Sequence, residues 1–457
     1  YDYIDYLINS GQGVPEFVFH QPYTVEQDFI SDITSQPSRY FQKYWARYYS
    51  GDGKSLQILT GDKMYYDDRF TNRYALAGGG HLTEPNITLA ANVDIDQEYV
   101  DDPLFPGDLS NYGHWFYGRV NQAYLSLHSD RFEFFLGRMK RNWGALNSPG
   151  LSLSDNPYSY DHALFSYTGD NVKFTTLYGR LEDVDALMVE NPDSLIRGAQ
   201  KHLIGHRFDF HITKNFQVGL TEMATYGGPG RGFEFVLLNP MNLYYGVQRN
   251  SGEILNVQYA LDVFWKPVSK ITFYSQFLVD DMILNIDPGV DDRAQYPDRL
   301  GVRTSLRTGD VMFEGLNTEI TYVRIWNRTY QSRNTWENYH YRGLGLGYPC
   351  AGCEEVKVKL SYWDRFPYVF HTQFIAGRYG DVDVTDLFMM NIESFPVKPV
   401  TRNFLWESSV EYFYNESVII SGGISYIQDK NHYQNRIRQG EGFSMTVEVN
   451  YLFSIGF

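Results

Sequence analysis

The sequence has few cysteines, no long apolar run and a shortage of positive charge. Two cysteines in 457 residues exclude a disulfide-rich secreted scaffold. No apolar stretch reaches the roughly 18 residues of a transmembrane helix, which excludes a helical membrane protein. Lys and Arg number 39 against 55 Asp and Glu, and a net charge of −16 argues against nucleic-acid binding, which needs a basic face. The first residues also lack a basic stretch before an apolar core, so we expect any signal peptide to have been removed already.

Aromatic residues, by contrast, are abundant. The chain has 38 Tyr, 31 Phe and 8 Trp, which make up 17% of it, although hydrophobic residues total only 43%. A polar chain rich in Tyr, Phe and Gly is typical of a soluble all-β protein or of a transmembrane β-barrel. The order of the residues distinguishes these two classes.

The last fifteen residues alternate between apolar and polar side chains. The apolar positions are Phe443, Met445, Val447, Val449, Tyr451, Phe453, Ile455 and Phe457. A period of two predicts a strand with one apolar face, and this strand is longer than the five or six residues usual in soluble proteins. A closing strand of a soluble sandwich is the alternative. The length and the terminal aromatic favour an outer-membrane barrel strand, whose apolar face meets lipid.

The same alternation recurs earlier in the chain. Val356 and Val358 alternate with Lys357 and Lys359, and a second run alternates around Arg207 and Asp209. A charge on the lipid face near the bilayer midplane costs about 2–4 kcal/mol. We therefore expect Arg207, Asp209, Lys357 and Lys359 to point into the lumen.

Connections between the strand-like runs alternate in length. Short turns are expected at 128–130, 168–170, 213–215, 268–270, 308–310 and 415–417. Long polar loops are expected at 97–114, 142–158, 183–199, 226–251, 285–297, 327–353, 381–401 and 429–440. The predicted strands are 55–67, 72–80, 86–96, 115–127, 131–141, 159–168, 171–182, 200–213, 215–226, 252–267, 270–284, 298–308, 311–326, 354–364, 367–380, 402–414, 416–428 and 441–457. The fold class is therefore an all-β transmembrane barrel of about 18 antiparallel strands, with short periplasmic turns and long outer loops.

The N-terminal region has helical rather than strand periodicity. Tyr3, Ile4, Leu7 and Ile8 repeat at helical spacing, and Gly11 can end that helix. Two more short amphipathic helices are predicted within 24–33 and 38–50. We therefore divide the chain into an N-terminal helical periplasmic subdomain, 1–52, and a transmembrane barrel, 53–457.

Four stretches give the sequence a family likeness. They are Gln21-Pro22-Tyr23-Thr24; Leu136-Gly137-Arg138 with Asn142-Trp143-Gly144, Gly150-Leu151 and Leu153-Ser154; Gly230-Arg231-Gly232-Phe233-Glu234 with Leu238-Asn239-Pro240 and Tyr244-Tyr245; and His340-Tyr341-Arg342-Gly343 with Leu346-Gly347 and Gly352. With them the chain resembles the Wzi family of outer-membrane capsule-assembly proteins, although Ala145-Leu146 replaces the Pro-Gly that often follows the family's Trp-Gly. The resemblance implies an 18-stranded barrel with a periplasmic helical bundle. It also implies a surface lectin without catalysis, which holds capsular or other exopolysaccharide at the cell exterior.

Two of the long loops contain the candidate sugar contacts, because sugar binding needs aromatic faces beside groups that hydrogen-bond to hydroxyls. The predicted polysaccharide-binding residues are Arg333, Trp336, Tyr339, Tyr341 and Arg342 in the loop at 327–348, and Arg231, Tyr244 and Tyr245 in the loop at 226–249. Arginines would suit an acidic polysaccharide despite the negative chain. The alternative is that these aromatics belong to the outer girdle or only pack the loops together.

The remaining motifs predict structural roles. The segment around Trp143, Gly144 and Gly150 is expected to fold inward as a structural plug. Cys350 and Cys353 lie in a predicted outer loop, where we favour a local disulfide over half of a zinc site because no second pair exists. Acidic clusters at Asp287, Asp291, Asp292 and Asp298, and at Asp381, Asp383 and Asp386, lack the spacing of a calcium site and are expected to be solvated.

No nucleophile–base set is identifiable, so we predict neither an enzyme nor a cofactor. The expected partners are outer-membrane lipid, lipopolysaccharide and surface polysaccharide, and the sequence leaves the oligomeric state open, a monomer included. The competing function is that of an outer-membrane porin or substrate-specific diffusion channel.

Overall fold

The structure is a computed structural model. It describes residues 2–11, 17–19, 53–66, 70–97, 99, 102, 104–105, 118–145, 148–188, 191–239, 241–251, 255–281, 297–365, 367–389, 394–415, 417–428 and 442–456. In these ranges, no helix is long and apolar enough to cross a membrane.

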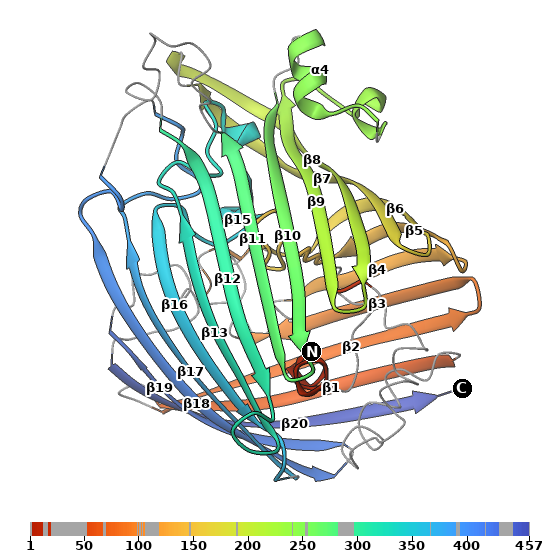
Figure 1. Ribbon diagram of the computed structural model, residues 1–457, viewed down its shortest axis with the longest axis vertical. Coiled ribbons are helices and arrows are strands. Elements are labelled where there is room, and N and C mark those ends of the chain that lie inside the picture. The colour runs from red at the N-terminus through yellow and green to blue at the C-terminus, as the bar shows by residue number, and fades with distance from the viewer. Residues whose placement is uncertain are drawn as a thin grey trace.

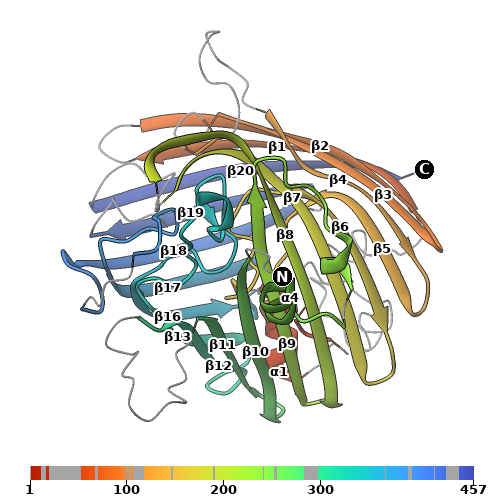
Figure 2. The same cartoon turned by 90° about the horizontal axis from the view of Figure 1, so that it is seen from above.

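Eighteen antiparallel strands form a closed barrel (Figures 1 and 2). They are β1 (Gly53–Tyr66), β2 (Phe70–Glu84), β3 (Ile87–Asp96), β4 (Gly118–His128), β5 (Phe132–Met139), β6 (Tyr160–Thr168), β7 (Val172–Met188), β8 (Asn191–Thr213), β9 (Phe216–Gly228), β10 (Asn256–Val268), β11 (Ile271–Asp281), β12 (Arg299–Gly309), β13 (Leu316–Ile325), β16 (Cys353–Tyr362), β17 (Tyr368–Tyr379), β18 (Thr401–Asn415), β19 (Val418–Ile427) and β20 (Gly442–Gly456). Each pairs with its neighbour in the chain, and β20 pairs with β1 to close the ring. The predicted 18-stranded barrel is confirmed.

Side chains alternate across the barrel wall as the period of two predicts. On β20, Phe443, Met445, Val447 and Phe453 are all more than half exposed, as expected for a face that meets lipid. On β16, Val356 is exposed, which turns its neighbours Glu355 and Lys357 to the lumen.

Arg207 and Asp209 on β8 point inward, as predicted. Both are almost completely buried, and the Arg207 guanidinium lies 2.8 Å from Asp209 Oδ1 and 3.0 Å from Asp262 Oδ2 on β10. Because a buried charge is costly unless it is paired, the lumen provides the place where these charges neutralise one another.

The two ends of the barrel differ in their connections. One end has tight turns, such as the two residues that separate β8 from β9. Since short turns face the periplasm in outer-membrane barrels, the end with long loops faces the exterior. At that end, the connection between β13 and β16 contains the 3₁₀ turn η4 (Thr335–Glu337) and a small two-stranded sheet. The two strands of that sheet are β14 (His340–Tyr341) and β15 (Leu344–Gly345). The 3₁₀ turn η2 (Phe235–Leu238) and helix α4 (Tyr244–Ser251) lie between β9 and β10.

The prediction of a long loop at 183–199 is wrong. Strands β7 and β8 continue through this region, with Asp183 paired to Gln200 and Leu187 to Leu195. The hairpin therefore rises above the ends of β10 and β11 (Figure 1). Outside the membrane a hairpin needs no apolar face, so the alternation that identifies the wall strands is not a guide to strands in this region.

Helix α1 (Asp2–Ser10) lies at the turn end of the barrel (Figure 1). Ile4 and Ile8 pack against the inward-facing Phe264 and Tyr274, and Asp5 Oδ2 lies 3.4 Å from Arg307 Nη1. The first predicted helix therefore occupies the lumen. The helices predicted at 24–33 and 38–50 lie outside the described residues, and the division of the chain at residue 52 stays a prediction.

Candidate functional site

Two loops from the exterior end fold into the lumen. We call the described residues 140–145 and 148–159, between β5 and β6, together with residues 326–352, between β13 and β16, the inner plug. The two loops bond to each other: the Tyr330 hydroxyl donates to Leu151 O at 2.8 Å, and Ser154 N donates to Leu346 O at 2.7 Å. Their buried side chains form one apolar cluster with inward-facing wall residues. The plug therefore fills the lumen on the side of β5–β16.

Inward-facing arginines of the wall bind the backbone of the plug. Arg207 Nη1 donates to Trp143 O at 3.3 Å, and Arg303 Nη1 donates to Pro149 O. Arg307 on β12 donates to the Ser148 hydroxyl and also contacts Glu319 Oε1 at 3.0 Å. Arg207, which the sequence predicts to face the lumen, thus fixes the plug together with Arg303 and Arg307, which were not predicted.

The motif around Asn142 shapes the first loop. Asn142 Oδ1 accepts hydrogen bonds from Gly144 N at 2.8 Å and Gly150 N at 3.0 Å, and its Nδ2 donates to Ser148 O at 2.9 Å. A Cβ atom on Gly144 would lie 2.4 Å from Ser148 O, and one on Gly150 would lie 2.3 Å from Leu153 O. Only glycine fits at both positions, so the motif determines the shape of the loop.

Trp336, Tyr339 and Tyr341 are buried within the plug. Trp336 packs against Ala199 and Val184 of the β7–β8 hairpin. Tyr339 stacks on Tyr330 with ring centroids 5.8 Å apart, and Tyr341 meets Tyr160 edge-on at 5.9 Å. Protein atoms cover these rings, so the three predicted sugar-stacking residues are part of the packing of the plug in this conformation.

Glu337 is a buried carboxylate that the sequence did not single out. Its side chain accepts hydrogen bonds from the Ser332 hydroxyl at 2.7 Å, Asn334 Nδ2 at 2.9 Å and Trp336 Nε1 at 3.1 Å. Burial raises the pKa of Glu337, and the three hydrogen bonds partly offset that rise. A single acidic residue is not a recognisable sequence motif, so the sequence did not identify Glu337. Its position directly after Trp336 is the one sequence feature that could have identified it.

Arg333 and Arg342 are exposed at the outer surface of the plug. The Arg342 guanidinium lies 5.6 Å from the Tyr341 ring, and Arg342 N donates to Glu182 Oε1 at 3.0 Å. The same carboxylate oxygen lies 3.9 Å from Lys201 Nζ and 3.7 Å from His340 Nδ1. Burial, and then the charge of Lys201, hold the pKa of His340 well below its usual value. Glu182 and Lys201 lie at the ends of two strands that the sequence predicts, 171–182 and 200–213, but the alternation alone does not show that they meet His340.

The other predicted residues lie on the outside of the barrel. We call the described residues 229–239 and 241–251 the outer flap, because their buried side chains pack against the outer wall of β8–β10. Tyr244 is fully buried there, with its ring 4.7 Å from that of His206, whereas Tyr245 is half exposed. Arg231 pairs with Glu234 at 2.6 Å and covers the Tyr226 ring. The structure therefore places the five predicted residues of 327–348 in the inner plug and the other three in the outer flap, and the charge of Arg231 still acts on Glu337 in the plug.

Comparison with known proteins connects this architecture to a family. The family model described as "Capsule assembly protein Wzi" matches residues 66–363. The chain belongs to the Wzi family. No match was found among curated proteins.

Solved structures agree with the Wzi barrel. The structure described as Wzi, an outer-membrane protein involved in group 1 capsule assembly in Escherichia coli and a carbohydrate-binding β-barrel, superposes with a TM-score of 0.64 at 14% identity, over 99% of this chain and 98% of that one. The outer-membrane protein OpdK of Pseudomonas aeruginosa gives a TM-score of 0.50 at 10% identity, over 88% of this chain and 99% of that one. At these identities the likeness shows the fold, and this Wzi-family chain is an outer-membrane barrel.

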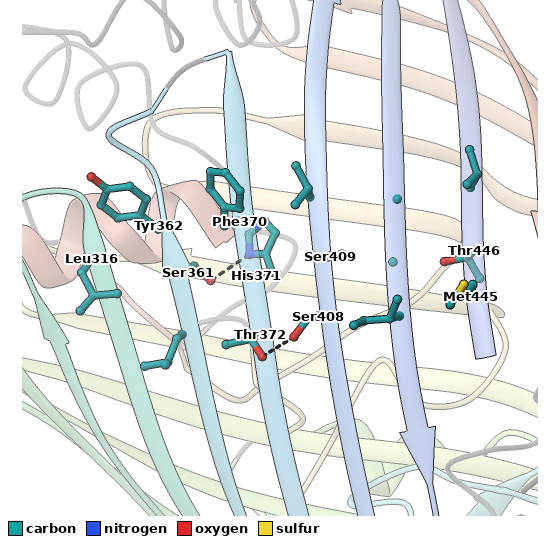
Figure 3. A pocket seen from close by; sticks show the side chains of 16 residues that line it. Leu316, Ser361, Tyr362, Phe370, His371, Thr372, Ser408, Ser409, Met445 and Thr446 are labelled. Carbon is teal, nitrogen blue, oxygen red and sulfur yellow. Dashed lines mark hydrogen bonds between the residues drawn. The ribbon is translucent and has the colours of Figure 1, made fainter. Parts of the chain in front are cut away.

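This Wzi-family barrel also has a groove of about 610 Å³ in its wall between β13 and β20 (Figure 3). Phe370, Ile424, Met445 and Val447, which line the groove, are all exposed on the outer face. The groove exists because the side chains between these residues are small, and it opens toward lipid. It is therefore not a candidate sugar site.

In this Wzi-family chain the two cysteines form a disulfide, and two residues of one acidic cluster form hydrogen bonds within a turn. Cys350 and Cys353 form a buried disulfide with 6.1 Å between Cα atoms, at the start of β16. Asp383 Oδ1 accepts from Thr385 N and Asp386 Oδ2 accepts from Asp383 N, both at 2.8 Å, so these carboxylates stabilise a turn. Asp287, Asp291 and Asp292 lie outside the described residues. Where side chains are described, no group of three or more His, Cys, Asp or Glu is placed to hold a metal ion.

Proposed function

We propose that this chain binds a surface polysaccharide at the exterior end of its barrel and acts as a lectin-like component of capsule or exopolysaccharide assembly, without catalysis. Membership of the Wzi family supports this proposal, as does the description of the E. coli protein as a carbohydrate-binding barrel. The observation that carries it here is Arg342, an exposed guanidinium above a packed aromatic loop.

In this proposal Arg342 and Arg333 contact the polysaccharide. Guanidinium groups form paired hydrogen bonds to carboxylates and also bond to hydroxyls. The buried Trp336, Tyr339 and Tyr341 hold the loop in place, so that little conformational entropy is lost on binding. Sugar contacts by Arg231, Tyr244 and Tyr245 stay a prediction.

The test measures binding of the full chain to capsular polysaccharide from its own source. Removing one charged hydrogen-bond donor weakens such contacts by about 1.5–3 kcal/mol, so we expect Arg342→Ala to raise Kd by about tenfold or more. Arg365→Ala is the matched control, since Arg365 is equally exposed but lies at the turn end. Unchanged binding in Arg342→Ala and Arg333→Ala together would exclude the proposed contacts, and Tyr245→Ala in the same assay tests the outer flap.

A diffusion channel is the second candidate, and the barrel fold shared with OpdK is the observation behind it. The inner plug argues against it, because two packed loops and α1 occupy the lumen. Recording currents across planar bilayers distinguishes the two. Large, steady single-channel currents from the intact chain would favour the channel.

A further inference from the structure

The outer wall of β8–β10 is polar where a membrane barrel should be apolar. On β9, Leu220 is exposed on the lipid face, and the next outward residue is Glu222. Glu222 pairs with His206 on β8, and His202 lies further along the same face. On β17, by contrast, the outward-facing residues from Tyr368 through Ala376 are uncharged. The first charged residue on that face is Arg378.

These polar residues lie within the height of the bilayer. A tilted strand needs about 9–11 residues to cross the hydrocarbon layer. Glu222 is only the seventh residue of β9 (Phe216–Gly228), counted from the periplasmic turn. A carboxylate facing acyl chains there would be strongly unfavourable.

The outer flap covers these groups. Tyr244 N donates to Glu222 Oε1 at 2.7 Å, and the Tyr259 hydroxyl donates to the same oxygen at 2.8 Å. His202 Nε2 lies 3.2 Å from Arg231 O, and the Tyr244 ring covers His206. As a result Glu222 is 6% exposed and His206 3% exposed.

The far side of the flap is strongly apolar. Phe233 is 52% exposed, Phe235 79%, Met241 82% and Leu243 64%. Several large apolar side chains exposed on one short segment indicate an interaction surface, because exposing them to water is unfavourable. At the end of α4, the exposed Arg249 lies 5.1 Å from the Tyr245 ring, an arrangement typical of a membrane interface.

We propose that the outer flap lies in the outer leaflet, where Phe233, Phe235, Met241 and Leu243 replace the barrel wall of β8–β10 as the surface in contact with lipid acyl chains. The exposed apolar side chains of the flap extend the lipid-facing surface that ends at Leu220, and the flap shields the polar groups that begin at Glu222. The proposed partner of this apolar surface is the acyl region of the lipid. The proposal does not depend on polysaccharide binding.

The test uses single-cysteine labelling of the full chain in nanodiscs that hold one barrel each. Met241→Cys and, separately, Phe235→Cys are labelled with the fluorophore NBD, while the native cysteines remain in their disulfide. Fluorescence is compared between discs of ordinary phospholipid and discs of phospholipid with brominated acyl chains, which quench only labels within the hydrocarbon. Heat-modifiable migration on gels verifies that each variant is folded.

We expect both flap labels to lose most of their fluorescence in brominated discs, as a label at Leu220→Cys on the barrel wall should. A label at Asp381→Cys, in an exposed outer loop, should lose none. If the flap labels behave like the Asp381 label while the Leu220 label is quenched, the flap lies in water and the proposal is wrong. Because each disc holds one barrel, contact with a second copy cannot alter the quenching of the labels.

Discussion

The inner plug and the outer flap begin as similar sequences and end on opposite sides of one wall. Both are long connections at the exterior end, and both are rich in tyrosine and arginine. The plug packs where the wall turns Arg207, Arg303 and Arg307 inward, whereas the flap packs where the wall turns His206 and Glu222 outward. The direction in which each loop folds therefore follows from the buried polar groups that it must satisfy, rather than from its own composition.

The largest expected effect comes from breaking the ion pairs beneath the plug. Arg207→Met leaves Asp209 and Asp262 buried without their cation and should destabilise the chain by about 3–5 kcal/mol. Denaturant unfolding of the purified barrel measures it. Arg131→Met is the control, since Arg131 and Asp170 form an exposed pair that should contribute about 0–1 kcal/mol. Equal effects of the two substitutions would contradict the role given to Arg207.

The next largest effect is expected from removing Tyr244, which anchors the outer flap to the barrel wall. Tyr244→Ala takes a large, fully buried side chain from the outer cluster and should cost about 3 kcal/mol of local stability. Hydrogen exchange should rise across 229–251 and stay unchanged across 326–352. Tyr244→Phe is the control: the Tyr244 hydroxyl has no hydrogen-bond partner among the described residues, so its loss should leave exchange unaltered. Faster exchange in both regions would show that the plug and the flap are coupled.

A smaller effect is expected from a single methyl group in the plug. Gly144→Ala places a Cβ 2.4 Å from Ser148 O and should destabilise the loop by about 1–3 kcal/mol. Faster exchange within 140–159, with the flap unaffected, is the expected result. Gly246→Ala in α4 is the matched substitution, because a Cβ there meets nothing within 4 Å.

The smallest effect is a dependence on pH within the plug. Because the pKa of buried His340 is lowered, folding favours its neutral form. The stability it contributes is therefore present above the usual histidine pKa and is lost as pH falls, by at most about 1.4 kcal/mol per pH unit. Protection against exchange across 326–352, relative to the intrinsic exchange rate at each pH, should decrease between pH 7.5 and 5.5 in the native chain. The decrease should be weaker in His340→Asn, and an identical response in the two proteins would show that another group titrates.

The sequence was sufficient to predict the barrel strands, but it was not sufficient to predict how the loops pack. Alternation across β20, from Phe443 to Phe453, predicts both the strand and its lipid face, because a strand's geometry is local. The same alternation places His206 on the outer face of β8, but it does not show that Tyr244 covers it there. The burial of Trp336 and Tyr339 likewise depends on Ala199 and Ser152, which are far away in the chain.

The pairing of Arg207 with Asp209 differs in sequence range from the contacts that hold the plug. The two residues are on one strand, so they can neutralise each other within β8, whereas Asp262 is on β10. The plug needs still more of the chain, since Tyr330 must reach Leu151 across 179 positions. Charge compensation in the wall is therefore partly local to one strand, whereas the packed lumen depends on the fold of the chain from β6 to β13.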